Sequence, residues 1–301
     1  MPPDNDKLIA VVGATGQQGG AVVRALQAAG QFKVRALSRN ADKHRDLADE
    51  VVEADLDRPE TLEAAFEGAH GVFLVTNFWE GGTDEFKQAT AAVRAAKNAG
   101  VKHFVWSTLP DVEAISGGKF DAAHFTGKAK IDRIVNEAGF EHHTFVIAPF
   151  YYQNLVGPLA PQTQADGSSG WALPLDPHVR CIHMGDINDL GNIVAGSFAH
   201  PDQAGSGEYL PLVGDFMSFN DIVDTLNRQG HQFAFNQVPK EVFATFFPGA
   251  AEVGETLSYF QAHTYLGSDS SDQIALANQI AGGQPSRFAT WARANFPVLV
   301  P

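Results

Sequence analysis

The chain has 301 residues, of which 44% are hydrophobic, and this length allows one large α/β domain or one domain with a smaller lobe. Its 35 acidic and 21 basic residues give a formal charge of −14, which argues against direct binding of bare nucleic acid or of an anionic membrane surface. The single cysteine, Cys181, excludes an intramolecular disulfide and favours a reducing, cytoplasmic location. We expect no signal peptide before the first strand, and no apolar run is long enough to span a bilayer.

The first predicted elements are a buried strand, a tight turn and the start of a helix. The apolar run 8–12 stops at Gly13, and Gly16 and Gly19 follow at intervals of three residues, before a helical pattern that ends at Gly30. Free backbone N–H groups and the positive end of the helix dipole converge at such a corner, which favours a phosphate there. We expect Gly13 to permit the turn, Gly16 to let a pyrophosphate approach and Gly19 to let helix and strand pack closely. The predicted cofactor contacts of this corner are Gly13, Thr15, Gly16, Gln17, Gln18 and Gly19.

Strand-like and helix-like segments then alternate up to about residue 150. The further predicted strands are 33–38, 51–54, 71–75, 103–107 and 143–148, and the further predicted helices are one opened by Pro59, 84–99 and 122–138. Strands separated by helices with short connections predict a parallel, doubly wound sheet of the Rossmann type. We therefore interpret residues 1–150 as an NAD(P)-binding α/β domain.

The pattern becomes less regular after residue 150. Residues 157–178 are rich in Pro, Gly and Ser and predict a loop-rich lid or lobe. The remaining predicted elements are strands at 181–184 and 208–213, helices at 186–199 and 218–229, and mostly short helices beyond these. We expect residues 179–214 to return to the main domain, and residues 151–178 and 215–301 to form a smaller loop- and helix-rich lobe for a substrate or partner.

The end of the second strand indicates which dinucleotide is preferred. NAD-selective sites place an acidic residue there for the ribose hydroxyls, whereas this chain has Ser38, Arg39 and Asn40. Arg39 offers a permanently charged donor fork for a 2′-phosphate, and Lys43 could add a second charge. We therefore favour NADP(H) and keep NAD(H) as the alternative; Arg39 as a solvated loop residue is the less favoured interpretation.

Polar residues follow three more of the predicted strands, where they would line the same crevice. Ligands of doubly wound folds bind outside the carboxyl ends of the strands. Single residues of this kind often only cap a strand, but their recurrence favours a shared ligand. The predicted contacts are Asp55 and Leu56 near the adenine, Thr76 and Asn77 near the ribose and pyrophosphate, and Ser107 and Thr108 near the nicotinamide.

Several longer segments resemble the NmrA-like family of atypical short-chain dehydrogenases/reductases. These segments are VVGATGQQGGAVVRAL (11–26), VRALSRN (34–40), FLVTNFWE (73–80), AAHFTGK (122–128), PFYYQNL (149–155) and FPGAAEVGETLSYF (247–260). The first is shared widely in the superfamily, and HFTGK, FYYQN and FPGA are more specific. The resemblance covers nearly the whole chain and implies further cofactor contacts at Phe78, Lys128, Pro149, Tyr151 and Asn154.

The resemblance also directs attention to a pair of candidate catalytic residues. Reductases of the superfamily use a tyrosine and, four residues later on one helix, a lysine that holds the ribose and lowers the pKa of the tyrosine. This chain has His124 in place of the tyrosine, followed by Lys128. By resemblance Lys128 keeps a cofactor-holding role, whereas His124 either relays a proton or only contacts cofactor or water without turnover.

Two functions compete on these observations. An intact nucleotide crevice with an altered catalytic pair favours an NADP(H)-binding redox sensor or regulator with a protein partner. The alternative is an NAD(P)H-dependent oxidoreductase acting on a quinone or similar small electrophile, and an isomerase or a reductase of secondary metabolism is a weaker third interpretation. An aromatic floor for a flat substrate, or alternatively core packing, is expected of Phe78, Trp79, Phe150, Tyr151 and Tyr152. The scattered histidines predict no metal site, and Cys181 is expected to be structurally buried.

Overall fold

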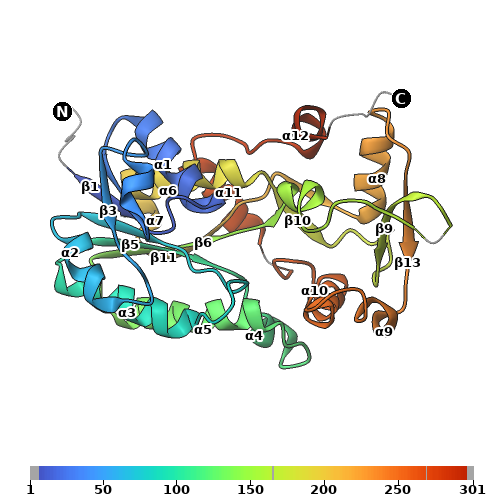
Figure 1. The fold of residues 1–301 in the computed structure, drawn as a ribbon, viewed down its shortest axis with the longest axis horizontal. Helices are drawn as coiled ribbons and strands as arrows, with labels where there is room; N and C mark the ends of the chain where they lie inside the picture. Colours follow the sequence, from blue (N-terminus) through green and yellow to red (C-terminus); the bar gives the residue numbers. More distant parts are fainter. Residues whose placement is uncertain (1–6, 165, 269, 297–301) are drawn as a thin grey trace.

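The computed structural model describes residues 7–164, 166–268 and 270–296, and its main feature is a seven-stranded sheet (Figure 1). The strand order is β11-β6-β5-β4-β1-β2-β3, and every neighbouring pair is parallel. Its strands are β1 (Leu8–Val11), β2 (Lys33–Ser38), β3 (Glu50–Glu53), β4 (Gly71–Leu74), β5 (His103–Thr108), β6 (His142–Ile147) and β11 (Ser206–Pro211). The predicted parallel, doubly wound sheet is confirmed.

Helices cover both faces of this sheet, as Figure 1 shows. The helices on one face are α1 (Gln17–Ala29), α6 (Leu190–Ala199), α7 (Pro201–Ala204) and α11 (Ser271–Ile280). Those on the other face are α2 (Leu62–Phe66), α3 (Glu85–Asn98) and α5 (Ala123–Glu137), with the short α4 (Val112–Ser116) before α5. Each face has its own buried apolar cluster, so the strands, which are apolar on both sides, lie between two cores.

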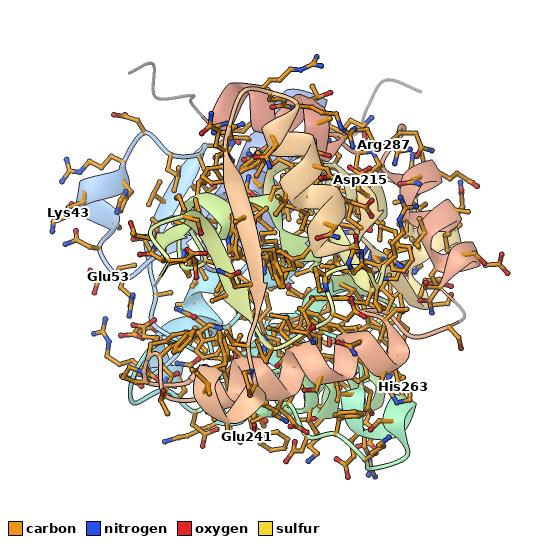
Figure 2. The ribbon with its side chains drawn as sticks, turned by 90° about the vertical axis from the view of Figure 1, so that its right-hand side faces the viewer. Lys43, Glu53, Asp215, Glu241, His263 and Arg287 are labelled. Carbon is orange, nitrogen blue, oxygen red and sulfur yellow. The ribbon has the colours of Figure 1, made fainter. Side chains whose placement is uncertain are left out.

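A second lobe lies beyond the carboxyl ends of the strands and has a third apolar core. Two three-stranded sheets, β12-β10-β7 and β13-β9-β8, form part of it. Its strands are β7 (Phe150–Tyr151), β8 (Gln162–Thr163), β9 (Ser169–Leu173), β10 (Ile182–Gly185), β12 (Asp215–Met217) and β13 (Phe233–Gln237). Its helices are α8 (Phe219–Asn227), α9 (Lys240–Phe243), α10 (Ala250–His263) and α12 (Phe288–Asn295). Figure 2 faces this lobe and labels Asp215 and Arg287; the Asp215 carboxylate accepts hydrogen bonds from Arg287 and from the hydroxyl of Tyr152.

The prediction of irregular structure for residues 157–178 and of helices after residue 229 missed the pair β9 and β13. These two strands run parallel, with Trp171 opposite Phe235. Gly170, which reads as a loop residue, has a φ of 154° and lies so close to β13 that a Cβ would be 1.8 Å from the carbonyl oxygen of Ala234. The strand therefore depends on a contact between segments more than 60 residues apart, which a local pattern does not encode.

Strand β11 extends the main sheet beside β6. Two other elements, β10 and α11, cross the expected boundaries between domain and lobe. Strand β10 pairs with β7 and β12 in a small sheet of the lobe. Helix α11 packs against α6 and β11, and its Ala277 and Ile280 lie in the same core as β1. Within the described residues, no helix combines the length and apolar character needed to cross a membrane.

A buried histidine at the start of β5 makes stability depend on pH. His103 contacts the hydroxyl of Thr144 at 2.9 Å, and burial, with smaller effects from His142 and His70, lowers its pKa to about 3. The unfolded chain therefore takes up this proton first, so the contribution of neutral His103 is complete above pH 6.5 and is lost as the pH falls towards 3. When the pH is lowered from 7 to 5, the free energy of unfolding should fall in the wild type by about 2 kcal/mol more than in His103→Gln, because only the wild type has this histidine. Urea denaturation at the two pH values measures the difference. Equal losses in both proteins would contradict this assignment.

Candidate functional site

A cavity of about 430 Å³ lies along the carboxyl ends of β1 to β4, where the sequence predicted the crevice. It has the volume of a small-molecule site. Most of the predicted cofactor contacts line it: Gly13, Thr15, Gly16, Gln17, Gln18, Gly19, Arg39, Asp55, Leu56, Thr76, Asn77 and Tyr151. Residues from five separate segments of the chain thus meet in one groove.

The glycine corner forms the floor of this groove. Gly13 has a left-handed φ of 71°, and its carbonyl accepts a hydrogen bond from the amide of Gly16 at 2.9 Å. Gly16 caps α1, whose first turn contains no acidic residue. A Cβ on Gly19 would lie 2.1 Å from the carbonyl oxygen of Gly13, so the helix approaches the turn as closely as a backbone can. The first amides of α1 therefore face the cavity with the positive end of the helix dipole, which fits a pyrophosphate.

The end of β2 carries the candidate for a 2′-phosphate. The guanidinium of Arg39 is largely exposed and is paired with the carboxylate of Glu80, which comes from the loop after β4. Asp55 and Asp57 add negative potential around the same guanidinium. Arg39 is thus available to a ligand. The acidic residues around it come from other segments of the chain, so the sequence next to Arg39 does not predict them.

A chain of three polar side chains lies where the nicotinamide was expected. The amide of Gln18 donates to the hydroxyl of Tyr151 at 2.6 Å and accepts from the hydroxyl of Ser107 at 2.6 Å. Burial raises the pKa of Tyr151 well above its usual value. Tyr151 is therefore a neutral phenol that connects the corner of α1 to β7.

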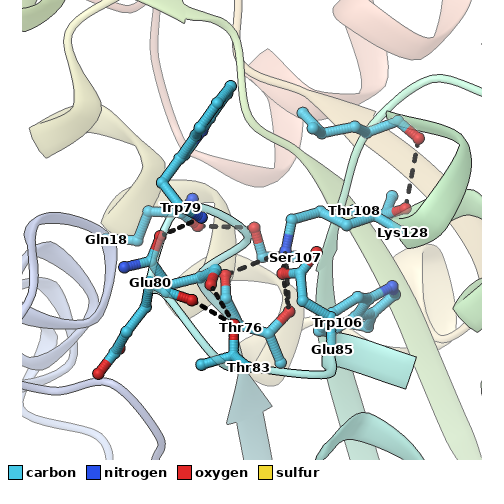
Figure 3. A network of polar contacts seen from close by, with 12 residues as sticks. Gln18, Thr76, Trp79, Glu80, Thr83, Glu85, Trp106, Ser107, Thr108 and Lys128 are labelled. Carbon is cyan, nitrogen blue, oxygen red and sulfur yellow. Dashed lines mark hydrogen bonds and ion pairs between the residues drawn. The ribbon is translucent and has the colours of Figure 1, made fainter. Parts of the chain in front are cut away.

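Lys128 is buried in an ion pair instead of lining the cavity. Its ammonium contacts Glu85 at 2.7 Å and donates to the carbonyl and the hydroxyl of Thr76 at 3.0 and 2.9 Å (Figure 3). Both charged side chains are less than 10% exposed. Burial lowers the pKa of Lys128, although Glu85 opposes this shift. The family resemblance implies that the ammonium of Lys128 holds the cofactor ribose, whereas here Glu85 neutralises its charge.

His124 is likewise held by an acidic partner. Its Nδ1 lies 2.7 Å from the carboxylate of Glu252 on α10. A carboxylate only accepts, so Nδ1 carries the proton that is shared. The rings of Phe78 and Trp79 lie 5.6 and 5.2 Å from the imidazole, and Trp79 is 59% exposed. Burial lowers the pKa of His124, with Glu252 opposing this shift, and in the neutral imidazole Nε2 is the remaining acceptor.

The structure places other predicted residues away from the cavity lining. Lys43 is exposed and points outward (Figure 2), while Thr108 is buried and its hydroxyl donates to the carbonyl of Leu109 at 3.3 Å. Pro149 is buried, and Asn154 lies in a short turn after β7. Ser107 contacts Gln18, which lines the cavity, and Phe78 packs beside His124. The roles of these residues in binding stay predictions.

The expected aromatic floor is only partly assembled. Phe78 and Trp79 lie together beside His124. Phe150 and Tyr152 are buried in the core of the second lobe, as the core-packing alternative expects, and so is Cys181, where burial raises the thiol pKa to about 12. Within the described part of the chain, no three His, Cys, Asp or Glu residues gather as metal ligands would, and the expectation of no metal site stays a prediction.

Sequence reasoning missed the three acidic partners Glu80, Glu85 and Glu252. Each one neutralises or positions a residue that was predicted, and each comes from a segment 41 or more residues away from its partner. Glu85 reads as an ordinary first-turn acid of α3, and Glu252 lies in a quoted family segment without a role attached to it. The one available signal was that buried or crevice-facing cations need counter-charges.

The parallel sheet and the glycine corner together define a protein with a Rossmann-type fold. The sequence pattern of the NmrA-like family matches residues 5–283, so the chain belongs to the NmrA-like family. It is 30% identical to an NmrA-like family domain-containing oxidoreductase of Aspergillus hancockii over 98% of this chain and 99% of that protein. It is 32% identical to an NmrA-like family domain-containing protein of Dictyostelium discoideum, covering 74% of this chain and 77% of that one.

Solved structures show the same fold. NmrA, a negative transcriptional regulator, in complex with NADP has a TM-score of 0.79 at 24% identity, covering 98% of this chain and 96% of that one. An NADPH-dependent quinone oxidoreductase of Escherichia coli, in complex with NADPH, has a TM-score of 0.76 at 20% identity, covering 96% and 100%. NmrA has also been solved with NAD. Structural relatives thus bind both dinucleotides.

Proposed function

We propose that this protein binds NADP(H) and acts as a redox sensor or regulator with little or no dehydrogenase turnover. The observation that carries the proposal is the contact between Nδ1 of His124 and the carboxylate of Glu252 at 2.7 Å. A neutral imidazole whose Nδ1–H is bound to Glu252 has no proton on Nε2 to give to a reduced substrate. The pairing of Lys128 with Glu85 points the same way, because it withdraws the second group of the catalytic pair.

The groove nevertheless fits a dinucleotide. Bound NADPH would supply the hydride chemistry, and the first amides of α1 would hold its pyrophosphate, with Arg39 at the adenosine end and Gln18, Ser107 and Tyr151 at the nicotinamide end. A regulator with this groove would change its contacts with a partner protein according to nucleotide occupancy. The expectation of no nucleic-acid contact, which rests on the charge of −14, is part of the same proposal.

Binding and turnover can be measured separately on the purified protein. NADPH and NADH are titrated by fluorescence, and a panel of quinones is then added while the absorbance of the reduced cofactor is followed. Binding without oxidation across the panel supports the sensor. Catalytic oxidation that disappears in His124→Ala would contradict the sensor proposal; loss in Lys128→Ala counts only where that variant is shown to be folded, because it leaves Glu85 unpaired.

The second candidate is an NAD(P)H-dependent oxidoreductase acting on a quinone or a similar small electrophile. The flat rings of Phe78 and Trp79 beside His124 favour it, because they could seat a planar substrate. It also agrees with the name of the Aspergillus relative. Its signature is the turnover described above, with a rate that rises at low pH, where protonated His124 gains an Nε2 proton.

The preference for NADP(H) over NAD(H) rests on Arg39. Arg39→Ala should weaken NADPH about ten- to a hundredfold and NADH much less, because a lost charge-assisted contact to phosphate costs about 1.5–3 kcal/mol. Arg45→Ala is the matched control, since Arg45 forms an exposed ion pair with Asp42 and does not line the cavity. Isothermal titration calorimetry of all three proteins gives both affinities, and equal losses for the two nucleotides would overturn the 2′-phosphate assignment.

A further inference from the structure

The segment 77–83, between β4 and α3, contacts both ends of the candidate site. Asn77, Glu80 and Thr83 line the nucleotide cavity. At the adenosine end Glu80 holds Arg39, and at the other end Phe78 and Trp79 lie against His124. One short segment therefore joins the candidate 2′-phosphate contact to the candidate proton-relay residue.

The segment is built as a compact turn. Thr83 donates from its hydroxyl to the carbonyls of Glu80 and Asn77 at 2.8 and 3.2 Å, and the amide of Trp79 donates to the side chain of Asn77 at 3.2 Å (Figure 3). Gly82, two residues after Glu80, has a left-handed φ of 83°. Because the turn is tied together internally, a displacement of Glu80 would be passed to its neighbour Trp79.

The contact between Glu80 and Arg39 competes with a ligand. The Glu80 carboxylate occupies a donor, Nη1, of the guanidinium that faces the cavity. The pair is largely exposed, with 64% and 39% of the two side chains accessible, and exposed pairs of this kind are weak. A phosphate monoester carries more charge and more acceptor oxygens than a carboxylate, so it should displace Glu80 from Arg39.

We propose that Glu80 is a built-in competitor for the 2′-phosphate, so that NADP(H), unlike NAD(H), displaces it and releases segment 77–83 with Phe78 and Trp79 from His124. This rests on the proposed nucleotide binding and adds the means by which occupancy is reported at the surface. NAD(H) has a hydroxyl where NADP(H) has the phosphate, so it leaves the pair of Glu80 and Arg39 in place. Binding of NADP(H), but not of NAD(H), thus changes the exposure of the rings of Phe78 and Trp79.

The first test removes the competing charge and keeps the shape of the side chain. Glu80→Gln should tighten NADPH about two- to fivefold and leave NADH within about twofold, measured by calorimetry. The matched control is Glu137→Gln, which breaks a similar exposed pair with Arg133 at the far end of α5 and should change neither affinity. In an Arg39→Ala background Glu80→Gln should have no further effect. Equal tightening of both nucleotides, or no tightening of NADPH, would overturn the competition.

The second test follows the release of Trp79. Trp79 is the exposed tryptophan among the four, since Trp106, Trp171 and Trp291 are buried. Saturating 2′,5′-ADP should change the tryptophan emission of the wild type, and 5′-ADP should not. Trp79→Phe should lose the change, and Glu80→Gln should show the shifted spectrum without ligand. The same change with 5′-ADP, or its persistence in Trp79→Phe, would overturn the coupling.

The outcomes separate this proposal from the one on which it rests. If neither NADPH nor NADH binds the wild type, the proposed function fails. If both bind and Glu80→Gln leaves their ratio unchanged, nucleotide binding holds and the role of Glu80 fails.

Discussion

Replacing Gly19 by alanine should abolish dinucleotide binding and lower the free energy of unfolding by about 3 kcal/mol. The new Cβ would lie 2.1 Å from the carbonyl oxygen of Gly13 and 2.8 Å from the amide nitrogen of Ala14. These are backbone atoms of the turn after β1, so no side-chain rotation relieves the clash. The start of α1 must instead move away from the turn, which separates the amides that converge on the pyrophosphate. Urea denaturation and NADPH titration measure the two effects.

The adjacent glycine provides the matched control. A Cβ on Gly20 would have the end of the Arg24 side chain at 3.3 Å and the carbonyl oxygen of Ala14 at 3.4 Å, distances that small shifts accommodate. Alanine also favours a helix interior by up to about 1 kcal/mol over glycine. Gly20→Ala should therefore stay within about 1 kcal/mol of the wild type and still bind NADPH. Loss of binding in both variants would mean that the corner tolerates no change in α1, and the argument from the Gly13 contact would be wrong.

The parts of this protein that were predictable are those that a short stretch of sequence determines. The run 8–12 followed by Gly13, Gly16 and Gly19 specifies a strand, a turn and a helix within one local unit, and the structure has all three. The parallel sheet follows by repetition of that unit. Residues directly after the strands, such as Thr76 and Asn77, then lie at one edge because of the topology alone.

The parts that were not predictable depend on partners that are distant in sequence. Gly170 is a strand residue only because β13 packs against it. The segment around Arg39 does not reveal Glu80, which pairs with it, and the segment around His124 does not reveal Glu252, which contacts its Nδ1. Each of these contacts changes the surroundings of a residue in a way that its own segment does not encode. A single sequence thus locates such residues better than it defines their protonation or charge state.

Removing one partner of the pair between Lys128 and Glu85 should cost about 3–5 kcal/mol of unfolding free energy, because it leaves an uncompensated charge in the core. The two side chains are 9% and 8% exposed, and the hydroxyl and carbonyl of Thr76 complete the coordination of the ammonium. Lys128→Met leaves the buried carboxylate of Glu85 without its counter-charge, and Glu85→Gln leaves the buried ammonium of Lys128 without its counter-charge. The exposed neighbour Lys130, paired with Glu113 at 3.5 Å, is the control, and Lys130→Met should stay within about 0.5 kcal/mol of the wild type.

The double variant distinguishes a buried charge pair from simple packing. Lys128→Met with Glu85→Gln removes both charges, and the glutamine can still accept the hydrogen bond that the Thr76 hydroxyl donates to Glu85 at 2.5 Å. Its loss of stability should therefore be smaller than either single loss, whereas packing defects would add. Lys128 does not line the cavity, and its charge is paired with Glu85. The double variant should therefore still bind NADPH. Additive losses of stability in urea denaturation would show that the ion pair is not the source of the effect. Loss of NADPH binding in a folded double variant would show that Lys128 contacts the cofactor, as the family resemblance implies.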